Sequence, residues 1–354
     1  MDRALSAPGK LFVSGEYAVL WGGTARVLAV GQRVAALCRR RGDRRVEIVL
    51  ESGRLAGEST PAGVHWEGLV DAPFHFVARA IDLALRAIGR ETTGFTVAFG
   101  TSPTSGGHKL GLGSSARAVV LASEAVRWAT EGSFDSLKLA LTAHAEAQGG
   151  KGSGGDVAAS FCGGFVRYRR FEVGPLIEAS VAGALGTALA QAPAVDVLRL
   201  GKPELPLLYA FSGESASTVK LVGQVEARRT AHQRAAFVSA SDALGDALEQ
   251  GLVRGDFAAV RGATVELQRL LADFAPAPSA PLDRLLAIAE GQGCTGKQSG
   301  AGGGDGCLLV APDHESAERL LGAFQSRGII AGRIEWAAGL RAEPRGEPPL
   351  IHWV

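Results

Sequence analysis

Glycine clustering is the feature that most limits how this chain can fold. The sequence holds 48 glycines among 354 residues, and they crowd into residues 100–113, 149–164 and 291–306. Clusters of this kind mark turns, or places where backbone must approach a ligand closely. Three of them predict either one binding site assembled from three loops or three ordinary loops, and glycine spacing alone leaves both interpretations open.

The apolar pattern around these clusters mixes strands and helices. Short β-rich runs predict strands over 11–20, 46–50, 95–99, 163–171, 206–211, 307–311 and 329–336. Apolar residues at helical spacing predict helices over 73–89, 116–129, 135–147, 217–250, 254–273, 282–291 and 314–327. The two kinds do not alternate regularly, so we expect a two-layer α+β fold rather than a doubly wound parallel sheet.

The length and the apolar content predict two domains. With 46% hydrophobic residues, the chain can bury a large core, and 354 residues exceed the usual size of one domain. Residues 172–200 are alanine-rich and weakly patterned, which places the boundary there. We therefore predict an N-terminal domain over 1–185 and a C-terminal domain over 186–354.

Charge and composition exclude several classes of protein. A formal net charge of +1 argues against a nucleic-acid partner, and the dense basic run RRRGDRR (39–45) is interpreted as a solvated hairpin loop. No apolar run is long enough to predict a membrane span or a signal peptide, so we expect a cytoplasmic protein. The four cysteines lack CxxC spacing, which disfavours structural zinc and disulfides.

The first cluster carries the stretch KLGLGSSARA (109–118) in front of an apolar helix. Ser114 or Ser115 can cap that helix, whose free N–H groups then form an anion site. A serine hydroxyl can also bind Mg²⁺, and Lys109 can neutralise phosphate charge. The alternative is a capped, buried helix after a flexible turn. The P-loop pattern GxxxxGK[ST] is absent, and the GxGxxG/A match lacks a strand directly before it.

The other two clusters repeat the combination of lysine, serine and aspartate. The second holds Lys151, Ser153 and Asp156, and the third holds Lys297, Ser299 and Asp305. Asp156 precedes an apolar helix, so it can be an N-cap or a group that acts on a substrate proton. Four of the seven lysines lie in or beside glycine-rich or PGK-type segments, which favours a polyphosphate ligand.

Three segments together resemble the signature motifs of the GHMP kinase superfamily. They are APGKLFVSGEYAVL (7–20), KLGLGSSARA (109–118) and SGAGGGDGCLL (299–309), in the order and spacing of that superfamily. Within it, the chain is most similar to the phosphomevalonate kinase family. That resemblance rests on GEYAVL in the first motif, a lysine before GLGSS, the segment GSGGDVAASFCGGFVRYRRF (152–171) and KQSGAGGGD (297–305).

The resemblance implies a fold, a reaction and a cofactor. The fold is an N-terminal domain like ribosomal protein S5 domain 2 and a ferredoxin-like C-terminal domain, with the site between them. The reaction is transfer of the γ-phosphoryl group of ATP, with Mg²⁺, to (R)-5-phosphomevalonate, which gives 5-diphosphomevalonate. The alternatives are mevalonate kinase, diphosphomevalonate decarboxylase and a non-catalytic binding protein. Monomer and homodimer both stay open.

The resemblance also assigns roles to residues by position. Lys10, Lys109 and Asp156 would act in catalysis. The ATP phosphates would be wrapped by Gly111, Leu112, Gly113, Ser114 and Ser115. The acceptor would lie beside Lys10, Ser153, Asp156, Ser299, Gly300 and Ala301. Mg²⁺ would be held by Ser115 and Glu146.

Two arginines depart from the family pattern. Arg117 stands where a small residue is usual, and we predict that it faces solvent rather than reaching a substrate phosphate. Arg26 stands where an apolar residue is expected.

Overall fold

Two long antiparallel strands organise the N-terminal half of the molecule. The computed structural model of the chain describes residues 2–101, 104–105, 108–214, 218–275, 277 and 279–344. In it, β1 (Asp2–Ser14) pairs with β2 (Thr24–Arg40) along almost its whole length. Further strands extend the sheet in the order β10-β9-β2-β6-β3-β4-β5, with β15 added beyond β1. These strands are β3 (Arg45–Leu50), β4 (Gly53–Thr60), β5 (Gly63–Trp66), β6 (Phe95–Phe99), β9 (Phe165–Arg169), β10 (Val197–Arg199) and β15 (Arg341–Ala342).

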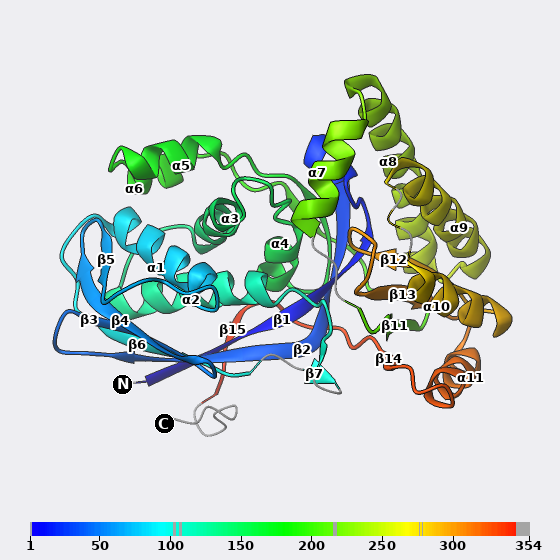
Figure 1. The fold of residues 1–354 in the computed structure, drawn as a ribbon, viewed down its shortest axis with the longest axis horizontal. Coiled ribbons are helices and arrows are strands. Elements are labelled where there is room, and N and C mark those ends of the chain that lie inside the picture. The colour runs from blue at the N-terminus through cyan, green and yellow to red at the C-terminus, as the bar shows by residue number, and fades with distance from the viewer. Residues whose placement is uncertain are drawn as a thin grey trace.

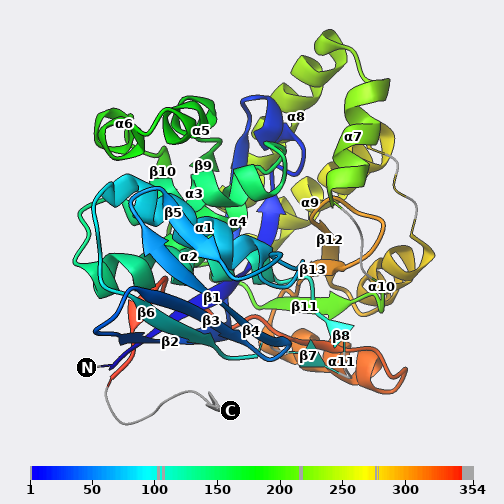
Figure 2. The same cartoon turned by 60° about the vertical axis from the view of Figure 1, so that its left-hand side comes forward.

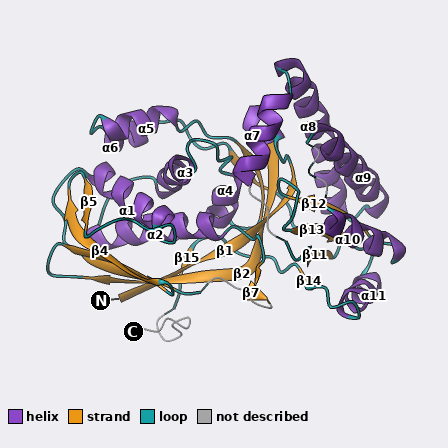
Figure 3. Ribbon diagram, in the orientation of Figure 1, coloured by secondary structure: helices purple, strands orange, loops and turns teal. Residues whose placement is uncertain are grey.

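Helices cover one face of this sheet (Figure 1, Figure 3). They are α1 (His75–Ile88), α2 (Ser114–Thr130), α3 (Ser136–Ala147) and α4 (Gly155–Cys162), with α5 (Gly174–Val181) and α6 (Leu185–Gln191) at the outer edge. Alternating strand residues such as Val46 and Ile48 are fully buried against apolar helix residues such as Val120 and Leu121. Burial of this apolar layer stabilises the N-terminal half.

The C-terminal half is built on a smaller antiparallel sheet in the order β12-β13-β11-β14. Its strands are β11 (Leu207–Phe211), β12 (Thr295–Ser299), β13 (Gly306–Val310) and β14 (Ala331–Arg333). Helices α9 (Phe257–Phe274), α10 (Ala280–Gly291) and α11 (His314–Gln325) pack around it (Figure 2). Two further helices, α7 (Thr218–Arg228) and α8 (Ala231–Arg254), stand where the two halves meet (Figure 1).

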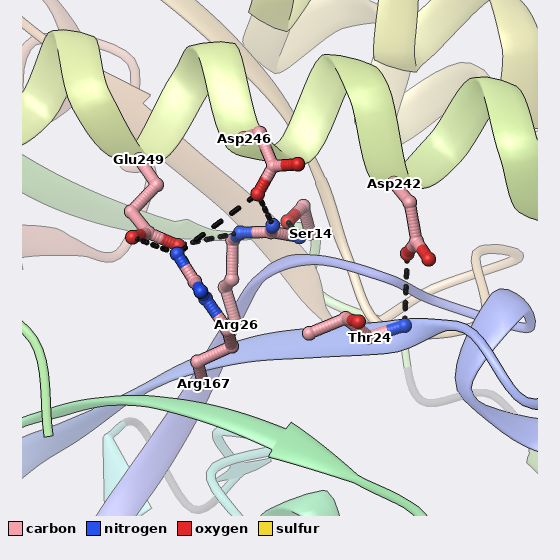
Figure 4. Close-up of polar contacts among 7 residues, drawn as sticks. All are labelled: Ser14, Thr24, Arg26, Arg167, Asp242, Asp246 and Glu249. Carbon is pink, nitrogen blue, oxygen red and sulfur yellow. Dashed lines mark hydrogen bonds and ion pairs between the residues drawn. The ribbon is translucent and has the colours of Figure 1, made fainter. Parts of the chain in front are cut away.

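The halves are joined by an apolar layer and a buried charge network. Leu28 and Phe165 of the first sheet pack in one cluster with Leu248 and Leu252 of α8. Beside them, Arg26 is 1% exposed and forms ion pairs with Asp246 and Glu249 of α8 (Figure 4). The arginine that the sequence pattern did not explain is therefore an interdomain contact.

The predicted α+β fold is confirmed, and several elements lie close to their predicted limits, whereas the single helix predicted over 217–250 is divided into α7 and α8. The prediction of a hairpin over 39–45 is wrong, because β6 lies between β2 and β3 in the sheet. The predicted strand over 11–20 ends earlier, because Gly15 turns the chain at φ 88° and the 3-10 helix η1 (Ala18–Trp21) follows. Several strands were not predicted, among them the 17-residue β2, the neighbouring β4 and β5, and β12, which lies inside the third glycine cluster.

The division at residue 185 stays a prediction about folding units. By strand pairing, the first sheet continues to β10, because Val197 pairs with Tyr168 of β9. It also takes back β15, in which Ala342 pairs with Leu5. The chain thus crosses between the halves again near its end. Among the described residues, no helix has the length and apolarity needed to cross a membrane.

Candidate active site

A cavity of about 370 Å³ opens between the two halves. Its volume lies in the range of small-molecule sites. Residues of all three glycine clusters line it, together with residues of β1 and the segment after it. The three clusters thus lie around one cavity rather than apart, and their role as one binding site stays a prediction.

Most of the predicted site residues share this cavity. The lining includes Lys10, Gly111, Leu112, Gly113, Ser114, Ser115, Ser153, Asp156, Gly300 and Ala301. Ser299 and Glu146 lie outside the lining. Lys109 belongs to β8 (His108–Lys109), which pairs with β7 (Thr104–Ser105), and its side chain lies outside the described part of the structure.

The glycine turn of the first cluster needs glycine at two positions. Gly111 and Gly113 have φ values of 68° and 78°, in the left-handed region that favours glycine. A Cβ atom on Gly111 would come within 2.7 Å of the Asp305 side chain, and one on Gly113 within 2.9 Å of Lys10 Cγ. The turn is thus held close to the third cluster and to β1.

Helix α2 begins directly at this turn. Its N-cap is Gly113, and no side chain caps it, so the prediction that Ser114 or Ser115 caps a helix from Ala116 is wrong. The helix starts earlier, at Ser114, and both serines lie within its first turn. Uncapped N–H groups at a helix start attract anions, and here they open onto the cavity.

The Ser115 hydroxyl and the Asp156 carboxylate both lie beside His144. A hydrogen bond of 3.0 Å joins Ser115 Oγ to His144 Nε2, and Asp156 Oδ2 lies 3.8 Å from the same nitrogen. The imidazole is buried and packs against Phe76. Sequence reasoning missed His144, which follows no motif and becomes a neighbour of Ser115 only when α3 packs on α2.

Asp156 does not cap α4. The N-cap is Gly154, and Asp156 lies in the first turn of the helix, where Oδ1 accepts a hydrogen bond of 2.9 Å from the N–H of Val157. Its carboxylate lines the cavity together with Ser153. The N-cap interpretation is wrong, and Asp156 is placed where it can contact a ligand.

The third cluster is tied to β1 by buried polar contacts. Lys297 is completely buried and forms an ion pair with Glu16, so this lysine serves the structure rather than the cavity. Ser299 Oγ donates a hydrogen bond of 2.9 Å to the carbonyl of Phe12, which explains why it does not line the cavity. Tyr17 donates one of 2.7 Å to the Ala301 carbonyl, and burial raises the pKa of the Tyr17 phenol.

Among the side chains that the structure describes, those of Lys10, Arg117 and Lys151 bring positive charge to the cavity. Lys10 Nζ donates a hydrogen bond of 3.2 Å to the carbonyl of Gly111, and Lys151 is exposed at the mouth. Arg117 is only 3% exposed, so the prediction that it faces solvent is wrong. The lining thus holds positive charge beside an uncapped helix start, an arrangement suited to polyanions.

Several oxygen-bearing side chains line the cavity. The described residues contain no group of three or more His, Cys, Asp or Glu side chains arranged for a metal. Glu146 forms an ion pair with Arg79, while the predicted ligand Ser115 lines the cavity together with the carboxylates of Glu16, Asp156 and Asp305. This set fits Mg²⁺, which usually keeps waters and binds substrate phosphates with one or two carboxylates.

The fold and the cavity together define a GHMP kinase. The family "GHMP kinases N terminal domain" matches residues 75–164, and "GHMP kinases C terminal" matches residues 248–330. A phosphomevalonate kinase of Streptomyces sp. (strain CL190) is 33% identical over 368 residues, which cover 93% of this chain and 92% of that protein. The chain belongs to the phosphomevalonate kinase family of the GHMP kinases.

Solved structures share the same fold. The Lin0012 protein of Listeria innocua superposes with a TM-score of 0.85 at 25% identity, covering 97% of this chain and 99% of that one. Streptococcus pneumoniae phosphomevalonate kinase in complex with phosphomevalonate and AMPPNP gives a TM-score of 0.78 at 23% identity, covering 94% and 99%. The second likeness bears on the fold alone.

Proposed function

We propose that this protein transfers the γ-phosphoryl group of ATP to the phosphate of (R)-5-phosphomevalonate, which gives 5-diphosphomevalonate and ADP. The observation that carries the proposal is the shared cavity, in which an uncapped helix start, Lys10 and Asp156 meet. The acceptor rests on the Streptomyces relative, which matches almost the whole chain and is named for that substrate.

The glycine turn and the start of α2 bind the nucleotide phosphates in this proposal. Gly111 and Gly113 leave room for an oxygen to approach the backbone, since neither carries a Cβ. The N–H groups at Ser114 and Ser115 supply donors at the positive end of the helix dipole. The AMPPNP in the S. pneumoniae complex supports ATP as the donor.

The acceptor is contacted by Lys10, Ser153 and Asp156 on one side. Gly300 and Ala301 contact it on the opposite side. The attacking group is a phosphate oxygen, which is already anionic near neutral pH and needs little help from a general base. The main barrier is repulsion between two polyanions, and Lys10 lowers it by placing a positive charge beside the reacting groups. Lys109 is proposed for the same role.

Mg²⁺ would neutralise phosphate charge when it is bound with ATP. Ser115 Oγ and the Asp156 carboxylate are the side chains that would hold it. Glu146 was predicted as a further ligand, and its ion pair with Arg79 makes it the weaker candidate. Because ATP and a phosphorylated metabolite are its substrates, we infer that the protein works in the cytoplasm.

The test is ADP release with Mg²⁺ and ATP in the presence of mevalonate, 5-phosphomevalonate or 5-diphosphomevalonate, with CO₂ trapped in parallel. ADP with 5-phosphomevalonate alone and no CO₂ is the expected result. ADP with mevalonate would move the assignment to mevalonate kinase, and CO₂ would move it to the decarboxylase. No turnover with any of the three would refute the proposed reaction.

A further inference from the structure

Arg117 is a buried cation that forms no ion pair with any carboxylate in the described part of the chain. It lies on α2, one turn after the glycine turn, and its backbone N–H bonds to the carbonyl of Gly113 at 3.2 Å. The side chain is 3% exposed and lines the cavity beside Gln32 and Leu110. Among the described residues, none of the ion pairs involves Arg117.

The guanidinium is also incompletely hydrogen-bonded. Nη1 donates a bond of 2.7 Å to the carbonyl of Gln32, and the buried Nε has no partner. Burial alone lowers the pKa of Arg117 to about 10, so it keeps its proton at neutral pH. A buried charge without a counter-ion is unfavourable by several kcal/mol, to order of magnitude. An anionic ligand in the cavity would supply the missing counter-ion.

The bond to Gln32 does not explain an arginine at this position. A neutral amide or a lysine could make a single bond to a backbone carbonyl without carrying five fixed donors into a cavity. Arginine is favoured where a planar group must bind a carboxylate or a phosphate through more than one N–H. The other anion-binding features of the cavity, the α2 start and Lys10, lie close by.

We propose that Arg117 binds a phosphate group in the cavity and contributes to substrate affinity beyond the glycine turn and the family lysines. The inference rests on the proposed function for the identity of the ligands, which are ATP and a phosphorylated acceptor. Both offer the same chemistry, a phosphate oxygen that accepts from Nε or Nη2. Arg117 is thus a binding residue that the signature motifs do not include.

The experiment measures binding to the full-length chain by calorimetry, with ADP and (R)-5-phosphomevalonate titrated separately. The variants are Arg117→Met, Arg117→Gln and Arg117→Lys. Arg127→Met is the matched control, because Arg127 lies on the same helix, outside the cavity, and its half-exposed side chain pairs with the buried Glu124. Loss of a charge-assisted hydrogen bond should weaken the Kd of at least one ligand by roughly 10- to 100-fold.

The two titrations show which ligand's phosphate Arg117 binds. A loss confined to ADP assigns Arg117 to the nucleotide phosphates, and a loss confined to 5-phosphomevalonate assigns it to the acceptor. Arg117→Lys should recover part of the affinity, and ligand-free Arg117→Met should melt at or above the wild-type temperature because an unbalanced charge is removed. Arg127→Met should change neither Kd.

The inference is overturned if Arg117→Met and Arg117→Gln bind both ligands within twofold of wild type. A lower melting temperature with unchanged affinity would show a purely structural arginine. If Arg117→Met fails to fold by circular dichroism, Arg117→Gln decides, because its amide can keep the bond to Gln32. Failure of the proposed function would give another result. The wild type would then not turn over 5-phosphomevalonate, while its affinity for ADP would still depend on Arg117.

Discussion

Replacing Glu249 should destabilise the protein, and replacing its buried partner Arg26 as well should recover most of the lost stability. Glu249 accepts a hydrogen bond of 2.9 Å from Arg26 and two, of 2.5 Å and 3.1 Å, from Arg167 (Figure 4). Breaking a buried ion pair by deleting one partner costs about 3–5 kcal/mol. We expect about 3 kcal/mol for Glu249→Leu, at the low end of that range, because Asp246 still pairs with Arg26.

The double variant Arg26→Met, Glu249→Leu removes the buried charge with its partner. Apolar replacement of a buried pair is often neutral or stabilising, so its stability should return to within about 1 kcal/mol of wild type. Arg167 is 40% exposed and can turn toward water. The matched control is Glu266→Gln, which breaks a surface pair with Arg269 and should cost less than about 1 kcal/mol.

Thermal unfolding followed by circular dichroism measures these differences. The unfolding entropy is about 2.1 cal/mol/K per residue. For a chain of 354 residues, a loss of 1 kcal/mol in stability therefore lowers the melting temperature by about 1.3 °C. Glu249→Leu should therefore melt about 4 °C below wild type. A melting temperature within 1 °C of wild type, or a double variant as unstable as the single one, would refute the argument that the network joins the halves.

The remaining predictions concern the site and one buried carboxyl. Lys10→Met should lower kcat by roughly 10²- to 10³-fold without changing the melting temperature, whereas Lys202→Met, an exposed change, should leave kcat alone. Asp156→Asn should lower kcat by about 10²-fold and by no more than Lys10→Met, since the acceptor is already anionic; a larger loss would point to an alcohol acceptor. Burial raises the pKa of Asp82 above its usual value of 3.8, so the folded state holds that proton more tightly than the unfolded state. The free energy of unfolding therefore falls as the pH rises from 3.8 through the folded-state pKa. Asp82→Asn should flatten this decline and keep the bond that Oδ1 accepts from Val64, while exposed Asp71→Asn should follow the wild-type pH profile.

Local pattern predicted some elements closely and missed others, including the long strand β2. The observed strand β6 has the limits predicted for it, 95–99. The helix predicted over 73–89 is α1, which begins two residues later and ends one residue earlier. Apolar periodicity predicts such elements because each buries its apolar face against a neighbour. The strand β12 escaped because TGKQS has no such pattern. Its Gly296 is required by close packing, since a Cβ there would lie 2.4 Å from Leu309 Cδ2.

Capping and exposure were the points at which local reasoning failed. Serine before an apolar run predicts an N-cap, but the left-handed Gly113 lets α2 begin one residue after it and leaves the hydroxyl of Ser115 for His144. Arginine predicts a solvated side chain, but the position of β2 across from α2 buries Arg117 against Gln32. The partners that Ser115 and Arg117 find, His144 and Gln32, are far away in the sequence.

The sequence by itself determined the class of fold, the family and the turns that can approach phosphate, because these depend on local pattern and on motifs in fixed order. Only the tertiary structure decided which charged groups serve the cavity. Lys297 and Arg26 are buried in ion pairs, while Lys10 and Arg117 face the cavity. The physical reason is that the groups packed around a cation decide whether it is paired or free to bind a ligand. Folding brings those groups together from distant parts of the chain.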